Sequence, residues 1–364
     1  MNKEDVKKIF DTVKDDYLSG YKENNHPVAF LLGGQGSVGK GKLSRVIVSQ
    51  NPNLQKIFFI NGDVYRNEHP DNKKLHHSPE IYSSETQDFS SVFTEGFIEE
   101  SIKRKLNVSV EGTMRNPKTP LTTADLFKKN GYKVEAYVIA APSEFSSLNI
   151  YTRYANELIQ GELGRLADKT SHDTAAEMMP TTVDILYERK AVDAIHIYSC
   201  FVKDKVTEYH LVNGIWDNKE LPSEAISKSR DEQKTDLSTM QSLMERSRII
   251  ESVISNPNIL KEVQAARENL DRLIKEEKAV QTVVERTRNS WAKRFTNEQL
   301  TILADYISSS ILGTPKEKVE HIWNKAEIRL EEQHTNSHWQ KDTHEEMLDL
   351  LEGRTRGQSY GWKI

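Results

Sequence analysis

Short apolar runs alternate with longer helical patterns between residues 28 and 214. The runs VAFLL and VEAYVIAA are almost continuously apolar, as is typical of strands buried on both faces of a parallel sheet. Segments of helical length separate the runs, so their order predicts β-α-β units and a mainly parallel sheet. We expect strands at residues 28–32, 57–60, 108–110, 134–141 and 194–198, with a further strand at 206–212 at the edge.

The pattern changes after Pro222. Apolar residues then recur at helical spacing, first from Leu237 to Ile254 and, after a break at Asn256-Pro257, from Ile259 to Val284 on a highly charged segment. We therefore expect an α/β domain over residues 1–222 and an all-α region over residues 223–364. The helical region could form a bundle on itself, pack on the first domain or serve as an arm that binds a partner.

The composition of the 364-residue chain excludes several classes of protein. A formal net charge of −5 gives no reason to expect nucleic acid as a partner. The single cysteine, Cys200, excludes an intrachain disulfide framework and a cysteine-cluster zinc site. The charged N-terminal segment has no signal-peptide pattern, and no run approaches the roughly 18 apolar residues of a membrane span. We expect a cytoplasmic protein with no membrane partner.

A glycine-rich segment follows the first predicted strand and leads into a helical pattern. Its residues Gly34, Gly39 and Lys40 match the pattern G-x-x-x-x-G-K. Such a turn lets successive backbone N–H groups surround a phosphate, and the N-terminus of the following helix adds positive potential. A phosphate-binding loop is therefore favoured over a plain strand–helix turn. The predicted binding residues are Gly34, Gln35, Gly36, Ser37, Val38, Gly39, Lys40 and Gly41.

The residue after Lys40 departs from the pattern. A Ser or Thr usually stands there, and its hydroxyl ligates Mg²⁺, but this chain has Gly41. Ser37 and Ser44 are nearby hydroxyls, yet neither occupies the usual position. Either other groups and water hold the metal, or catalysis is weakened, and we assign no residue as a metal ligand.

Charged residues follow the predicted strands at the edge where the loop lies. Asp63 comes after the second strand and Glu111 ends the third, and ligands of open parallel sheets bind beyond the carboxyl ends of the strands. A carboxylate there can accept a hydroxyl proton or coordinate Mg²⁺ indirectly; the alternative is a turn-capping Asp and an isolated Glu. Arg153 and Arg165 follow the fourth strand. They could neutralise a transferring phosphoryl group, although most arginines at such spacing are solvated surface residues.

Together these segments resemble the zeta toxin family of toxin–antitoxin kinases. The loop at residues 34–41 resembles the family's GQPGxGK[ST], with several departures, and the order of motifs recurs from about residue 25 to 200. The further segments that carry the resemblance are Asp63 with His69-Pro70, Thr94-Glu95, Val110-Glu111-Gly112-Thr113-Met114-Arg115, Arg153-Tyr154, and Gly164-Arg165 with Lys169 and His172-Asp173.

The resemblance implies a P-loop kinase core that uses ATP or GTP to phosphorylate the 3′-hydroxyl of UDP-N-acetylglucosamine, which blocks cell-wall synthesis. It implies that Lys40 holds the nucleotide phosphates, that Asp63 is the base, and that Arg153 and Arg165 clamp the transferring phosphate. Gly41 leaves the handling of Mg²⁺ open. The implied substrate-binding residues are Glu95, Glu111, Thr113 and Arg115.

Other functions fit the same residues. One is a nucleotide-binding interaction protein, in which Gly41 marks weakened or lost turnover and the helical region carries the function. Another keeps the kinase fold with a different hydroxyl substrate, such as a nucleoside or another sugar. The helical region could be a built-in antitoxin-like element, a docking arm or a delivery segment, and a small helical antitoxin could be a separate partner.

Overall fold

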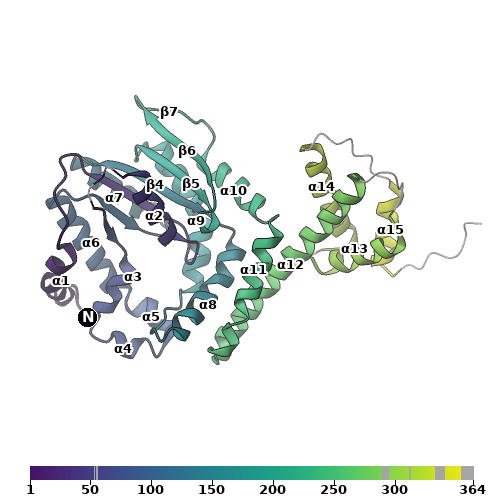
Figure 1. Ribbon diagram of the computed structural model, residues 1–364, viewed down its shortest axis with the longest axis horizontal. Coiled ribbons are helices and arrows are strands. Elements are labelled where there is room, and N and C mark those ends of the chain that lie inside the picture. The colour runs from purple at the N-terminus through teal and green to yellow at the C-terminus, as the bar shows by residue number, and fades with distance from the viewer. Residues whose placement is uncertain (53, 55, 289–294, 311–312, 333–340, 354–364) are drawn as a thin grey trace, which may run out of the picture. The chain divides into compact units, whose positions relative to one another are not determined.

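A mainly parallel sheet forms the centre of the first part of the chain (Figure 1). The computed structural model describes residues 1–364 except 53, 55, 289–294, 311–312, 333–340 and 354–364. Over this described part, the strands lie in the order β2-β3-β1-β4-β5-β6-β7. They are β1 (Val28–Gly33), β2 (Phe58–Ile60), β3 (Val108–Glu111), β4 (Lys133–Ala140), β5 (Ala194–Ser199), β6 (Lys205–Val212) and β7 (Ile215–Trp216).

The strand predictions are confirmed. Strands β1 to β5 pair in parallel, and β6 runs antiparallel to β5. The short strand β7, which the apolar pattern does not predict, pairs antiparallel with β6 and takes the edge position. Because β1 lies between β3 and β4, the segment that follows β1 begins near the middle of the carboxyl edge of the sheet.

Helices cover both faces of this sheet. Residues of α1, α6, α7, α9 and α10 share one core with alternate residues of β4, such as Val134, Ala136 and Val138. On the other face, Gln50 at the end of α2 donates a hydrogen bond to the hydroxyl of Tyr198 in β5 at 3.0 Å. The helices here are α1 (Lys3–Leu18), α2 (Lys40–Gln50), α3 (Gly62–Tyr65), η1 (Arg66–Glu68), α4 (Asn72–Leu75), α5 (Pro79–Glu85), α6 (Gln87–Lys103), α7 (Lys118–Lys129), α8 (Ser143–Ile159), α9 (Lys169–Glu188), η2 (Cys200–Val202), α10 (Pro222–Gln233) and η3 (Ile250–Ser252).

The chain separates into two compact units, residues 1–233 with 246–260 and residues 234–245 with 261–364. Helix α10, which the sequence pattern groups with the helical region, belongs to the first unit. The side chain of its last residue, Gln233, donates to the carbonyl of Ala140 at 2.6 Å and accepts from the N–H of Cys200 at 2.8 Å. These bonds fix the end of α10 against β4 and η2.

The rest of the C-terminal part is helical, as predicted. Its helices are α11 (Leu237–Ser247), α12 (Pro257–Arg288), α13 (Asn297–Ser310), α14 (Pro315–Glu332) and α15 (Lys341–Leu351). Trp323 of α14 is buried in a second core, to which α12, α13 and α15 also contribute. The buried Glu277 accepts two hydrogen bonds from Arg329 at 2.7 and 2.6 Å, so its carboxylate is paired with a cation inside the helical bundle. In the described part of the chain, no helix combines the length and the apolar character needed to cross a membrane.

Candidate active site

The segment between β1 and α2 folds as a loop that only certain residues permit. Gly34 and Gly39 have φ angles of 141° and 105°, a region that glycine enters at little cost. A Cβ atom at Gly39 would lie 3.0 Å from the Cα of Phe201, so this glycine is also required by close approach to η2. Ser37 is left-handed as well, with a φ of 61°. The loop ends at Lys40, the first residue of α2, as a phosphate cradle requires.

The ammonium group of Lys40 lies inside this loop. It donates hydrogen bonds to the carbonyls of Gly34 and Gln35, both at 2.9 Å, and lies 3.7 Å from Oε1 of Glu111. Only 10% of its side chain is exposed. Burial lowers the pKa of Lys40, and the carboxylates of Glu111 and Asp63 oppose that shift. A nucleotide phosphate bound in the loop would place further negative charge beside the Lys40 ammonium group.

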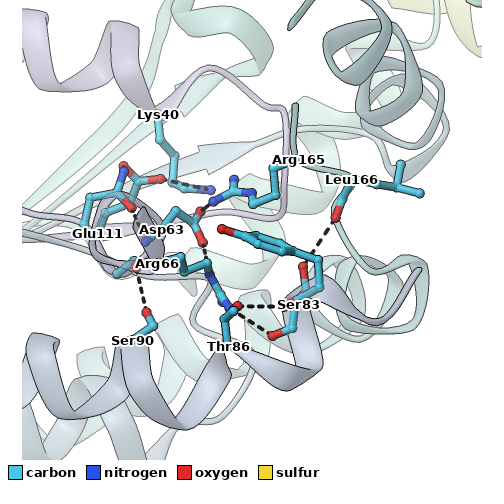
Figure 2. A network of polar contacts seen from close by, with 12 residues as sticks. Lys40, Asp63, Arg66, Ser83, Thr86, Ser90, Glu111, Arg165 and Leu166 are labelled. Carbon is cyan, nitrogen blue, oxygen red and sulfur yellow. Dashed lines mark hydrogen bonds and ion pairs between the residues drawn. The ribbon is translucent and has the colours of Figure 1, made fainter. Parts of the chain in front are cut away.

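Asp63 lies between two arginines at the same edge of the sheet (Figure 2). Its Oδ1 lies 3.1 Å from Nε of Arg66, and its Oδ2 lies 2.5 Å from a terminal nitrogen of Arg165. Burial alone would raise the pKa of the Asp63 carboxyl, but the charges of Arg165 and Arg66 outweigh burial and hold that pKa below its ordinary value. Asp63 is therefore held as a carboxylate.

Glu111 is joined to Asp63 through Asn61, a residue that the motif analysis missed. The Asn61 carboxamide donates to Oε2 of Glu111 at 3.0 Å, and its oxygen accepts the N–H of Asp63 at 3.0 Å. Asn61 is thereby the N-cap of α3, a position for which Asn is strongly preferred. Its place directly before Gly62-Asp63 is the signal that could have identified it. One side chain thus joins the Glu111 carboxylate to the backbone of Asp63.

Arg66 is a second residue that the motif analysis missed. It is 6% exposed, and its guanidinium donates to the carbonyl of Ser83 at 2.9 Å and to the hydroxyl of Thr86 (Figure 2). The hydroxyl of Ser90 in α6 donates to the carbonyl of Gly62 at 2.6 Å. Arg66 therefore ties the turn that carries Asp63 to the end of α5, and Ser90 ties it to α6. The only sequence signal is that Arg66 stands three residues after Asp63, within reach on a helix.

Arg153 and Arg165 are brought together by Glu157. The Glu157 carboxylate lies 3.3 Å from Nε of Arg153 and accepts the backbone N–H of Arg165 at 2.8 Å. Arg153 also donates to the carbonyl of Arg165 at 3.4 Å. Burial, and then the nearby charge of Arg165, lower the pKa of Arg153. Two cations held close together at a partly buried position favour the binding of an anion.

Three of the substrate residues implied by the resemblance make no hydrogen bond or ion pair with this cluster in the described part of the chain. Glu95 of α6 pairs with Lys3 of α1 at 3.2 Å, and both side chains are exposed. Thr113 and Arg115 follow Glu111 in the chain, and no hydrogen bond or ion pair in the described part joins either of them to Lys40, Asp63 or Glu111. Their roles remain predictions from the resemblance.

Gly41 lies in the first turn of α2 and is open to solvent. A Cβ atom there would meet nothing within 4 Å, so the position has room for a side chain. Its φ does not require glycine. Among the described residues, no group of three or more His, Cys, Asp or Glu could hold a metal ion.

The comparisons with known proteins cover the same part of the chain. The family model described as Zeta toxin matches residues 11–220. Toxin PezT of Streptococcus pneumoniae serotype 4 is 32% identical over 181 residues, which are 49% of this chain and 71% of that protein. Toxin zeta of Enterococcus hirae is 27% identical over 190 residues, 51% of this chain and 65% of that protein.

A solved structure extends the similarity to the fold. It comes from work on the PezAT chromosomal toxin–antitoxin system of Streptococcus pneumoniae, and it aligns with a TM-score of 0.58 at 22% identity. The alignment covers 69% of this chain and 98% of that chain. The two chains thus share the P-loop kinase fold predicted from the sequence.

Proposed function

The chain belongs to the zeta toxin family, and from this premise we propose that it is a kinase that transfers the γ-phosphate of ATP or GTP to the 3′-hydroxyl of UDP-N-acetylglucosamine. The product would no longer serve cell-wall synthesis. One observation carries the proposal: the loop lysine Lys40, the carboxylates Glu111 and Asp63, and Arg165 form one continuous set of contacts. This is the set of charges that phosphoryl transfer to a hydroxyl needs.

In this proposal, each residue of the site has a separate role in phosphoryl transfer. The acceptor hydroxyl donates a hydrogen bond to the Asp63 carboxylate. The hydroxyl oxygen forms a bond to the γ-phosphorus while the bond between the γ-phosphorus and the β-phosphate oxygen breaks, and ADP or GDP leaves. The proton passes to the Asp63 carboxylate late, because the hydroxyl becomes acidic only as the new bond forms. Lys40, Arg153 and Arg165 neutralise the charge on the transferring group. Glu95, Glu111, Thr113 and Arg115 would position the sugar nucleotide.

A partner protein is part of the same proposal. The solved structure that shares the fold comes from a toxin–antitoxin system, and a curated relative is called a toxin. We propose that a helical antitoxin restrains this kinase, supplied either by a separate protein or by the chain's own helical C-terminal part.

The acceptor can be identified by mass spectrometry. The protein is incubated with ATP or GTP and a panel of nucleotide sugars and nucleosides, and each acceptor is examined for one added phosphate. We expect the phosphate on UDP-N-acetylglucosamine. Transfer only to another hydroxyl compound would support kinase activity but would contradict UDP-N-acetylglucosamine as the substrate. Nucleotide binding without transfer to any acceptor would favour the second candidate, an interaction protein in which Gly41 reflects lost turnover.

Gly41 gives a prediction about metal use. Because its position is open, Gly41→Ser should fold normally and add one oxygen ligand for Mg²⁺ beside the phosphates. We expect transfer to rise by roughly threefold to tenfold, and the Mg²⁺ concentration for half-maximal rate to fall, with little change in nucleotide affinity. Gly41→Ala is the matched control because it fills the same space without an oxygen. Equal rates and equal Mg²⁺ requirements for the Ser and Ala variants would contradict the missing-ligand explanation.

The ion pairs of Asp63 give a prediction about pH. Asp63 acts as a carboxylate, and since Arg165 and Arg66 hold its pKa below the ordinary value, the active form is lost only as the pH falls through that lowered pKa. At saturating nucleotide and metal, kcat/KM for the acceptor should therefore stay flat from about pH 8 to about pH 6. A fall in rate with a midpoint near pH 7, absent from a variant that lacks Asp63, would show that Asp63 titrates in the neutral range.

A further inference from the structure

Two consecutive carbonyl groups of the phosphate loop are held by neighbours outside the loop. The carboxamide of Asn149 in α8 donates to the carbonyl of Ser37 at 2.7 Å. The backbone N–H of Phe201 in η2 donates to the carbonyl of Val38 at 2.9 Å. Neither donor belongs to the motif, and Asn149 is more than a hundred residues away in sequence.

These bonds fix the direction of the backbone N–H groups. A trans peptide unit is planar, and its C=O and N–H point to opposite sides; no cis peptide bond occurs in the described part of the chain. When the Ser37 carbonyl points to Asn149, the N–H of Val38 must point away from α8. When the Val38 carbonyl points to Phe201, the N–H of Gly39 must point away from η2. Both N–H groups are thereby directed away from these neighbours and left for another acceptor, such as a phosphate.

The Ser37–Val38 peptide follows a residue with an unusual backbone conformation. Ser37 is left-handed, a conformation that glycine adopts easily and serine does not. Rotation of this peptide would change ψ of Ser37 and φ of Val38 but leave the φ of Ser37 at 61°. It would turn the Ser37 carbonyl toward the phosphates in place of the Val38 N–H. Asn149 opposes that rotation because its hydrogen bond exists only in the observed orientation.

The position of Asn149 on α8 links the loop to the arginines. Asn149, Arg153 and Glu157 follow one another at intervals of four residues, so they lie on the same face of the helix. At one end of this face Asn149 holds the loop, and at the other Glu157 holds the backbone of Arg165. A single rigid helix thus sets the distance between the phosphate loop and the residues that neutralise the transferring phosphate.

We propose that Asn149 is a positioning residue for nucleotide binding, which holds the Ser37–Val38 peptide so that the Val38 N–H donates to a phosphate of the nucleotide. The inference rests on the proposed function, since it requires that the loop binds a nucleotide. Asn149 itself does not touch the reacting atoms. Its removal should therefore weaken the binding of phosphates and leave the acceptor site intact.

The test compares Asn149→Leu with the wild-type chain by calorimetric titration with ATP in the absence of acceptor. We expect roughly tenfold weaker ATP binding, the scale for loss of one charge-assisted hydrogen bond to a phosphate. The affinity for UDP-N-acetylglucosamine should be unchanged and the melting temperature nearly so, because Asn149 is only half-buried. Asn149→Asp keeps the shape but cannot donate, and its negative charge should weaken ATP binding further.

Thr152→Val is the matched control. Thr152 lies on the same helix, is 4% exposed, and its hydroxyl donates to the carbonyl of Leu148 in its own helix. It should bind ATP like the wild type. Equal ATP affinity of wild type, Asn149→Leu and Asn149→Asp, with all three folded, would overturn the role of Asn149 and leave the proposed function standing. Failure of the wild-type chain to bind any nucleotide would overturn both.

Discussion

Lys40→Ala is expected to abolish phosphate transfer and to weaken nucleotide binding, while the chain stays folded. In the structure Lys40 is the one loop residue that supplies a full positive charge inside the cradle, and it is held there by the carbonyls of Gly34 and Gln35. Alanine leaves the backbone N–H groups in place but removes the charge that compensates the β- and γ-phosphates. We expect the loss in kcat/KM to exceed about 10³-fold.

Lys42→Ala is the control for this variant. Lys42 is an exposed lysine two residues further along α2, so its removal changes the net charge equally without altering the cradle. Calorimetry with ATP and a thermal melt on both variants separate lost binding from lost folding. Unchanged ATP affinity in a folded Lys40→Ala protein would contradict the proposal that this loop binds a nucleotide.

Asp63→Asn should keep nucleotide binding and lose transfer by roughly 10²-fold or more, the usual scale of general-base catalysis. Asn can still accept a hydrogen bond from Arg66, so the turn that carries it should persist, but it cannot take the proton of the acceptor hydroxyl. The substitution also leaves Arg165 without its carboxylate partner. Single-turnover rates with saturating ATP and acceptor measure the effect on the chemical step.

Asp71→Asn serves as the control, because Asp71 is exposed and its side chain does not cap the following helix. It should transfer phosphate at the wild-type rate. Equal turnover in Asp63→Asn would reduce Asp63 to a residue that orders its turn. Glu111, which is held by Asn61 and lies near Lys40, would then be the candidate base.

Much of the fold could be predicted from the sequence because two of its inner strands, β1 and β4, are nearly continuous in apolar residues. Such runs are buried on both faces, and their order along the chain leaves few ways to arrange a parallel sheet. The phosphate loop was predictable for a similar reason. Its glycines are required by backbone conformation and by the close approach of η2 to Gly39. Because these glycines are close together in sequence, they form a motif that can be recognised without the structure.

The supporting residues of the site could not be predicted in this way. Arg66, Asn149 and Glu157 act through partners that lie 17, 112 and 8 residues away, namely Ser83, Ser37 and Arg165. Apart from the spacing of Arg66 from Asp63, nothing in their local sequence distinguishes them from surface residues. Glu95 is a different case: its place in a motif predicts a role at the substrate site, its side chain pairs with Lys3 in the structure, and its role stays a prediction.

The most direct test of the kinase proposal is the rate of γ-phosphate transfer from labelled ATP or GTP to UDP-N-acetylglucosamine, measured beside the same sugar nucleotide lacking its 3′-hydroxyl. We predict that the label appears on UDP-N-acetylglucosamine, that the deoxy compound stays unlabelled, and that Lys40→Ala abolishes the signal. Binding of nucleotide with no transfer to the sugar, or equal labelling of the deoxy compound, would contradict the proposal.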